Sequence, residues 1–123
     1  MQSMPPILIV DDNAEARDCL SMLLELHGST AIAGADSGEE ALERLNREQF
    51  GIVICDFHLG GMNGLEFVSQ FRARGDTTPV LLVTGSDDES IRNEAASHSR
   101  VGFFNKPFTF GELGERIQQL LAA

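Results

Sequence analysis

Residues 52–64 read IVICDFHLGGMNG, and this stretch decides the fold. Its first four residues are apolar without a break, which is typical of a strand that a parallel sheet buries on both faces. Asp56 ends the strand, and a loop with three glycines follows. Because open α/β sheets bind their ligands at the carboxyl ends of the strands, Asp56 is a candidate site residue. An Asp at this position also often does no more than start a turn.

Short apolar runs of the same kind recur on both sides of this stretch. The runs at 7–10, 30–35, 80–83 and 101–105 predict four more strands, and the small side chains of 30–35 suit a sheet edge. The segment at 86–98 has a thin apolar stripe, so we expect it to be the least firmly held helix. A segment of helical periodicity follows every strand, and the predicted helices lie at about 16–27, 37–45, 63–71, 86–98 and 109–121.

Five strand–helix pairs in strict alternation predict a doubly wound α/β domain. Each crossover between parallel strands is right-handed and covers one face, so the predicted five-stranded parallel sheet has helices on both faces. The strand order 2-1-3-4-5 is common in sheets of this size. That order would place Asp11, Asp12 and Asp56 side by side, with Thr84 and Lys106 on neighbouring strands at the same edge.

Three carboxylates in one pocket repel one another. Each close pair costs about 4 kcal/mol at ~4 Å and an effective dielectric near 20, so the carboxylates must protonate, separate or bind a cation. An all-oxygen acidic site that is open to water suits Mg²⁺. With the Lys106 ammonium and the Thr84 hydroxyl nearby, such a site would receive a phosphoryl group. An Asp carboxylate can itself be the nucleophile that forms an aspartyl phosphate.

The composition limits the remaining classes of function. The chain has 123 residues, which fits one domain, and its formal net charge of −10 argues against binding to nucleic acid or anionic lipid. No apolar run approaches the roughly 18 residues of a membrane span, and no signal peptide opens the chain, so we expect a cytoplasmic protein. Residues 1–4 are expected to be a disordered start, and Cys19 and Cys55 to be buried free thiols.

The residues at the strand ends resemble a known family. An acidic pair after the first strand, Asp56 after the third, Thr84 after the fourth and Lys106-Pro107 after the fifth resemble the receiver domain of bacterial two-component response regulators. The resemblance covers residues 7–121. It implies a single flavodoxin-like (βα)5 domain at residues 5–122. It also implies a phosphorylation-dependent signalling switch. Such a domain is not an enzyme that acts on other substrates, because it catalyses only its own phosphorylation and dephosphorylation.

The resemblance assigns a phosphoacceptor and a magnesium site. Asp56 would be the phosphoacceptor and would take the phosphoryl group from a histidine kinase or a histidine phosphotransfer protein. Asp12 would bind Mg²⁺ directly and Asp11 through water, and Asp56 and the backbone carbonyl of His58 would complete the protein ligands. Lys106 would contact the phosphoryl oxygens.

The resemblance also implies how the signal leaves the site. Thr84 would contact the phosphoryl group, and Thr84 and Phe103 would form the switch. Their movement would change the surface formed by the fourth helix, the fifth strand and the fifth helix. A downstream protein, an output domain or a second copy of the chain would bind there, whereas no nucleic acid or membrane contact is expected of this domain alone.

Some positions depart from the family pattern, and other functions stay open. Gly60 stands where the family usually has Pro, residues 97–100 read SHSR, and Phe103 lacks the hydroxyl of a Tyr. One alternative is a receiver-like interaction module that is never phosphorylated. Another is a magnesium-dependent aspartyl-phosphate phosphatase of the haloacid dehalogenase type, but residues 11–14, DDNA, lack its two-residue spacing between acids. A flavin mononucleotide carrier does not fit the acidic first loop.

Overall fold

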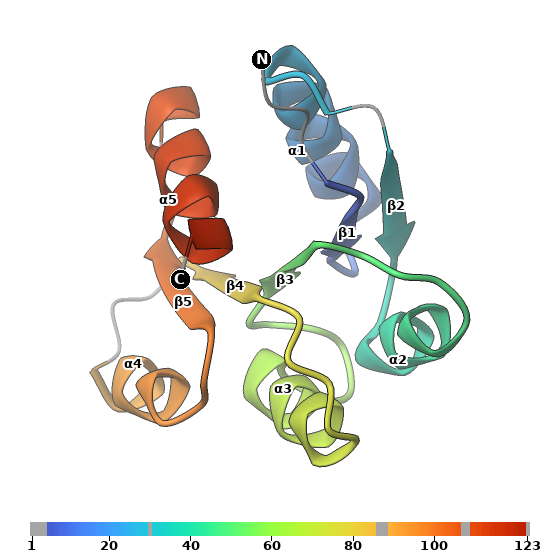
Figure 1. The fold of residues 1–123 in the computed structure, drawn as a ribbon, viewed down its shortest axis with the longest axis vertical. Coiled ribbons are helices and arrows are strands. Elements are labelled where there is room, and N and C mark those ends of the chain that lie inside the picture. The colour runs from blue at the N-terminus through green and yellow to red at the C-terminus, as the bar shows by residue number, and fades with distance from the viewer. Residues whose placement is uncertain (1–4, 30, 86–88, 107–108, 123) are drawn as a thin grey trace.

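The computed structural model describes residues 5–29, 31–85, 89–106 and 109–122. Residues 1–4, expected as a disordered start, and Pro107 of the Lys-Pro motif lie outside this range. Strands and helices alternate along the whole chain (Figure 1). The strands are β1 (Ile7–Val10), β2 (Ile32–Ala35), β3 (Ile52–Asp56), β4 (Val80–Thr84) and β5 (Val101–Asn105), and the helices are α1 (Ala14–Leu26), α2 (Gly38–Arg47), α3 (Gly64–Ala73), α4 (Glu89–Ala96) and α5 (Phe110–Ala122).

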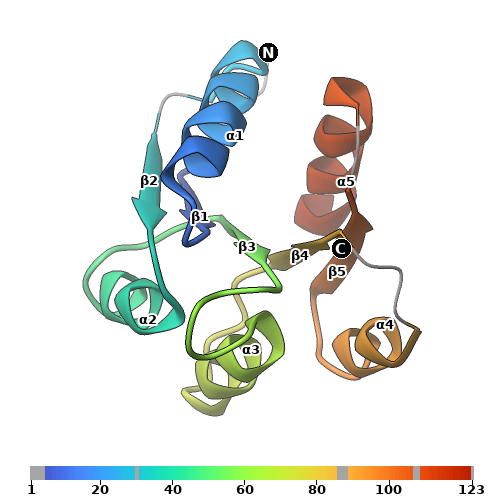
Figure 2. The same cartoon turned by 180° about the vertical axis from the view of Figure 1, so that it is seen from behind.

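The five strands form one parallel sheet in the order β2-β1-β3-β4-β5. Helices α1 and α5 cover one face, and α2, α3 and α4 cover the other, as the two opposite views show (Figures 1 and 2). The predicted doubly wound fold and its strand order are therefore confirmed. The order brings the carboxyl ends of β1 and β3 together at the middle of the sheet.

The apolar core consists of two layers, one on each face of the sheet. Alternate residues of each strand enter alternate layers, because successive side chains of a strand point to opposite faces. The layer under α2, α3 and α4 includes Leu82 and Phe71, and the layer under α1 and α5 includes Val83 and Phe104. The four apolar residues 52–55 of β3 are all buried, as the uninterrupted run predicts.

Several element boundaries differ by one to three residues from the sequence-based expectations, and so does the burial of one cysteine. The second strand begins at Ile32. Helix α4 ends at Ala96 and not near His98, because the N–H groups of Ser97 and His98 bond to carbonyls only three residues back, in a tighter turn. Cys55 is buried as expected, but Cys19 is exposed, so that prediction is wrong for Cys19.

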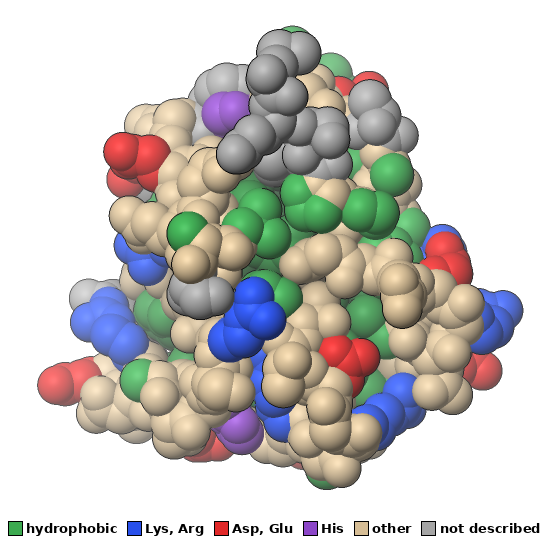
Figure 3. Space-filling view, viewed as in Figure 1, with side chains coloured by type: hydrophobic (Ala, Val, Ile, Leu, Met, Phe, Trp, Pro, Cys, Tyr) green, Lys and Arg blue, Asp and Glu red, His purple; other side chains and the backbone are tan. Residues whose placement is uncertain are grey.

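Apolar side chains also gather in the space between α1 and α5 on the face seen in Figure 3. A cavity of about 170 Å³ lies against the inner side of α1 and is lined mainly by apolar side chains of α1, β1, β3 and β4. Asp11, Asp56 and Lys106 also line it. Among the described residues, no helix combines the length and apolarity that crossing a bilayer requires.

Candidate functional site

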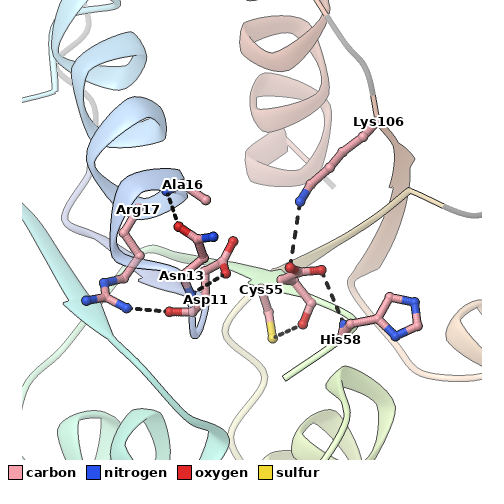
Figure 4. A network of polar contacts seen from close by, with 8 residues as sticks. Asp11, Asn13, Ala16, Arg17, Cys55, His58 and Lys106 are labelled. Carbon is pink, nitrogen blue, oxygen red and sulfur yellow. Dashed lines mark hydrogen bonds and ion pairs between the residues drawn. The ribbon is translucent and has the colours of Figure 1, made fainter. Parts of the chain in front are cut away.

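The three carboxylates predicted to meet at the sheet edge do so. Because β1 pairs with β3 in a register that places Val10 opposite Cys55, the residues that follow each strand emerge side by side. One oxygen from each of Asp11, Asp12 and Asp56 lies within 4.8 Å of the other two. We call these three residues the acidic cluster. Figure 4 shows Asp11 on the left and Lys106 on the right along this edge of the sheet.

Asp11 is the buried member of the acidic cluster, with 8% of its surface exposed. Its Oδ1 accepts a hydrogen bond from the Asn13 backbone N–H at 2.9 Å, and Arg17 Nη1 donates to the Asp11 backbone oxygen (Figure 4). Burial raises the pKa of Asp11, and the charges of Asp56 and Asp12 raise it further. The Asn13 N–H and the Lys106 ammonium act in the opposite direction on this pKa but do not reverse it.

Asp56 lies between the acidic pair and the lysine. Lys106 Nζ is 3.6 Å from Asp56 Oδ2, and the backbone N–H of His58 donates to Asp56 Oδ1 at 3.2 Å (Figure 4). Lys106 is the one lysine of the chain. Its backbone N–H donates to the Thr84 carbonyl at 2.7 Å. This hydrogen bond fixes the Lys106 backbone to the end of β4. The carboxylate of Asp56 is thus anchored on two sides.

The loop after Asp56 folds back closely enough to require glycine at position 64. The Gly64 N–H donates to the Phe57 carbonyl at 2.8 Å. A Cβ on Gly64 would lie 2.8 Å from Leu82 Cδ2 and 3.1 Å from the Phe57 Cα. Asn63 then starts α3 with a capping box that it completes with Glu66. Gly60, which stands where the family usually has Pro, passes close to Asp12: its Cβ would lie 3.7 Å from Asp12 Oδ2.

Thr84 and Phe103 lie on the neighbouring strands β4 and β5, and Thr84 is the closer of the two to Asp56 in the sheet register. Thr84 is fully buried at the end of β4, one position beyond the residue paired with Asp56. Phe103 pairs with Leu82, and Thr84 pairs with Asn105. Since side chains two apart in a strand share a face, Thr84 and Phe103 are diagonal neighbours on the face that α4 covers. The structure therefore brings every sequence-predicted site residue to this edge or next to it.

The arrangement has the chemistry of a cation and phosphoryl site. Three carboxylates within 4.8 Å of one another are oxygen ligands of the kind that Mg²⁺ prefers, and the exposed side of the site leaves room for its waters. The acidic cluster therefore fits a divalent cation. The Lys106 ammonium on the far side of Asp56 adds the positive charge that a phosphoryl group needs.

Sequence reasoning missed three residues around the site. Asn13 caps α1 by accepting the Ala16 N–H at 3.0 Å, and an Asn directly before a helix is the signal that could have revealed it. Arg17 crosses from α1 to the end of β1, passing over Gly34 of β2. Arg92 of α4 stacks on Phe103. The two arginine contacts join separate elements and leave no local pattern in the sequence.

Fold and site define a doubly wound α/β domain with an acidic cluster and a lysine at the carboxyl edge of its parallel sheet. The sequence profile described as response regulator receiver domain matches residues 7–118, so the chain belongs to this family. Members of the family are signalling domains of two-component systems. They interact with histidine kinases and with downstream output domains or proteins.

Three similar proteins illustrate the match. The chemotaxis protein CheY of Pseudomonas aeruginosa is 36% identical over 116 residues, which cover 93% of this chain and 94% of CheY. The transcriptional regulatory protein FixJ of Bradyrhizobium diazoefficiens is 30% identical over 115 residues, 94% of this chain but only 56% of FixJ, so the chain spans about half of that relative. The structure of response regulator TrrA from Thermotoga maritima in complex with Mg²⁺-BeF has a TM-score of 0.84 and 29% identity, and the match covers 95% of this chain and 99% of TrrA.

Proposed function

We propose that residues 5–122 form a phosphorylation-dependent switch in which Asp56 accepts a phosphoryl group, with Mg²⁺ held by the acidic cluster. The donor would be a histidine kinase or a histidine phosphotransfer protein. The observation that carries the proposal is the position of Asp56, which has a carboxylate oxygen within 4.8 Å of oxygens of Asp11 and Asp12 and lies 3.6 Å from Lys106 Nζ. Those neighbours are what an aspartyl phosphate needs.

The transfer is a displacement at phosphorus. A carboxylate oxygen of Asp56 attacks, an oxygen–phosphorus bond forms, and the phosphorus–nitrogen bond to the donor histidine breaks; the released imidazole takes its proton from water. Asp12, Asp56 and the His58 carbonyl would hold Mg²⁺ directly and Asp11 through water, and the bound ion would neutralise charge on the transferring oxygens. Lys106 would pair with a phosphoryl oxygen, and Thr84 would donate its hydroxyl to another.

We further propose that the new charge moves Thr84 and then Phe103. The phosphoryl group brings about −2 charge and three acceptor oxygens at neutral pH. Drawing Thr84 toward Asp56 would free space beside Leu82, which the Phe103 ring could enter from the neighbouring strand. The surface formed by α4, β5 and α5 would then change its shape. A downstream protein, an output domain or a second copy of the chain would read that change.

Support for the magnesium-dependent step comes from TrrA, which binds Mg²⁺-BeF in a structure that superposes on this chain with a TM-score of 0.84. Beryllofluoride resembles a phosphoryl group in shape and charge. The acidic cluster here offers carboxylate oxygens for the metal and Lys106 for the anion.

The test is phosphorylation by acetyl phosphate, followed by the mass of the intact protein. With Mg²⁺ the wild-type chain should gain one phosphoryl group, and with a chelator it should gain none. Asp12→Ala should weaken Mg²⁺ binding and slow labelling by about tenfold or more, as loss of a metal contact does. Glu15→Ala is the matched control, because Glu15 is a neighbouring acid in the first turn of α1, outside the acidic cluster.

An unlabelled wild-type chain in the presence of Mg²⁺ would favour the alternative of a receiver-like module that works without phosphorylation. Equal losses in Asp12→Ala and Glu15→Ala would reject Asp12 as a metal ligand while leaving the phosphoacceptor assignment intact.

A further inference from the structure

An arginine of α4 holds the aromatic ring proposed to be part of the switch. The Arg92 guanidinium carbon lies 5.3 Å from the centre of the Phe103 ring, within the range of a cation–π interaction. Arg92 Nη2 is also 3.4 Å from the side-chain oxygen of Asn105. Phe103 and Asn105 are two apart in β5, so one guanidinium spans two residues on the same face of the strand.

Thr84 lies on this same face. The register of β4 and β5 pairs Leu82 with Phe103 and Thr84 with Asn105. Leu82 belongs to the core layer against which the Phe103 ring packs, and Thr84 is two residues further along β4. The ring thus contacts the Arg92 guanidinium of α4 and lies diagonal to Thr84 on the neighbouring strand β4. Movement toward Thr84 would separate the ring from the guanidinium.

We infer that Arg92 is a positioning residue that holds Phe103 in the half-exposed position of this structure and opposes its movement toward Thr84. The role of that movement in signalling rests on the proposed function, whereas the contact between Arg92 and Phe103 does not. Phe103 has no hydroxyl that could hold the ring by a hydrogen bond, so the stacked guanidinium takes that role. A cation–π contact near the surface changes such an equilibrium by about two- to fivefold.

The chain provides its own control on the opposite face of β5. Arg116 of α5 stacks on Phe104 at 5.2 Å, and Phe104 is buried in the core layer under α1 and α5. Arg116 also donates to the backbone oxygen of Phe103 at 3.2 Å, so it contacts the same residue without touching its ring face. Losing Arg116 removes the same charge and the same kind of contact but should not release the Phe103 ring.

The experiment places 4-fluorophenylalanine at position 103 and records fluorine NMR spectra of the whole chain without Mg²⁺ or a phosphoryl donor. The inward position is assigned by its proximity to the Thr84 methyl group. Arg92→Gln should raise the ratio of inward to outward ring about two- to fivefold over the parent protein. Arg92→Lys keeps a cation at the ring and should restore most of the parent ratio. Arg116→Gln should leave the ratio unchanged.

An equal ratio in the parent and Arg92→Gln proteins, including the absence of an inward signal from both, would overturn the inference. So would an equal increase in Arg116→Gln, which would show a general loosening of β5. Failure of the proposed function is distinguishable, because it would appear as an Asp56 that acetyl phosphate does not label, whatever the ring populations are.

Discussion

At the scale of single residues, burial sets the chemistry of Asp11 and of the two cysteines. Asp11 is 8% exposed and lies near two other carboxylates, and burial followed by those charges raises the pKa of its carboxyl above the ordinary Asp value. Burial also lowers the reactivity of a thiol, because only the thiolate reacts with electrophiles and burial disfavours the thiolate. The ionised Asp11 carboxylate therefore lowers the stability of the folded chain unless a bound cation offsets its charge.

The raised pKa of Asp11 predicts how stability depends on pH. In the pH range between its ordinary value and its folded value, the folded chain binds more protons than the unfolded chain, so stability falls as pH rises through that range. Without divalent cations at pH 7, Asp11→Asn should increase the free energy of unfolding by on the order of 1 kcal/mol. The gain should shrink as the pH falls toward about 4. Urea unfolding measures this.

Asp18 is the control for that experiment, because it is an exposed Asp on α1. Asp18→Asn should change the free energy of unfolding by less than about 0.5 kcal/mol at either pH. A loss of stability in Asp11→Asn at pH 7, in the absence of metal, would contradict the electrostatic account of the acidic cluster.

The two cysteines should react at very different rates. Burial raises the pKa of the Cys55 thiol, whereas Cys19 is exposed on α1. Iodoacetamide should therefore modify one thiol of the native chain and both thiols in denaturant, and peptide mapping should locate the native adduct at Cys19. Cys19→Ser should abolish native labelling. Rapid native alkylation of Cys55 would show that the end of β3 opens far more often than its packing implies.

At the scale of elements, caps and close approaches fix where each helix begins. Asn13 and Asn63 cap the two helices that follow the site strands, and Gly64 lets α3 start directly against β4. Among the described residues of α4 only the small Ala95 is buried, so few apolar contacts of this helix lie in the core. Its contact with β5 through Arg92 is correspondingly more important to the surface beside it.

Substitution of Gly64 tests whether its close approach to β4 fixes the start of α3. Gly64→Ala should lower the free energy of unfolding by about 1–3 kcal/mol, because its Cβ would overlap Leu82 and the Phe57 backbone. Gly111, in the first turn of α5, has open space around the position of a Cβ, so Gly111→Ala should be neutral or stabilising by up to about 1 kcal/mol. Chemical denaturation compares the two. Equal effects would mean that helix propensity alone governs both sites.

At the scale of the whole molecule, the sequence predicts the strand order and the meeting of the strand ends. Unbroken apolar runs and the alternation with helices are local patterns, and the handedness of each crossover leaves few topologies for five such units. The exposure of Cys19, the reach of Arg17 and the stacking of Arg92 on Phe103 were not predictable in this way. They depend on how each helix is rotated and shifted on the sheet, which packing across distant elements decides.

Asp56 itself is proposed to carry the phosphoryl group, and chemical reduction of the phosphorylated chain can locate that group. An aspartyl phosphate is an acyl phosphate, which borohydride reduces to an alcohol, so treatment after acetyl phosphate and Mg²⁺ converts the phosphorylated Asp to homoserine. Peptide mass spectrometry then reads the position. We expect homoserine at position 56, none in the chelator control, and none at any position in Asp56→Asn. Homoserine at position 11 or 12 in the wild-type chain, or a phosphoryl adduct that survives in Asp56→Asn, would contradict it.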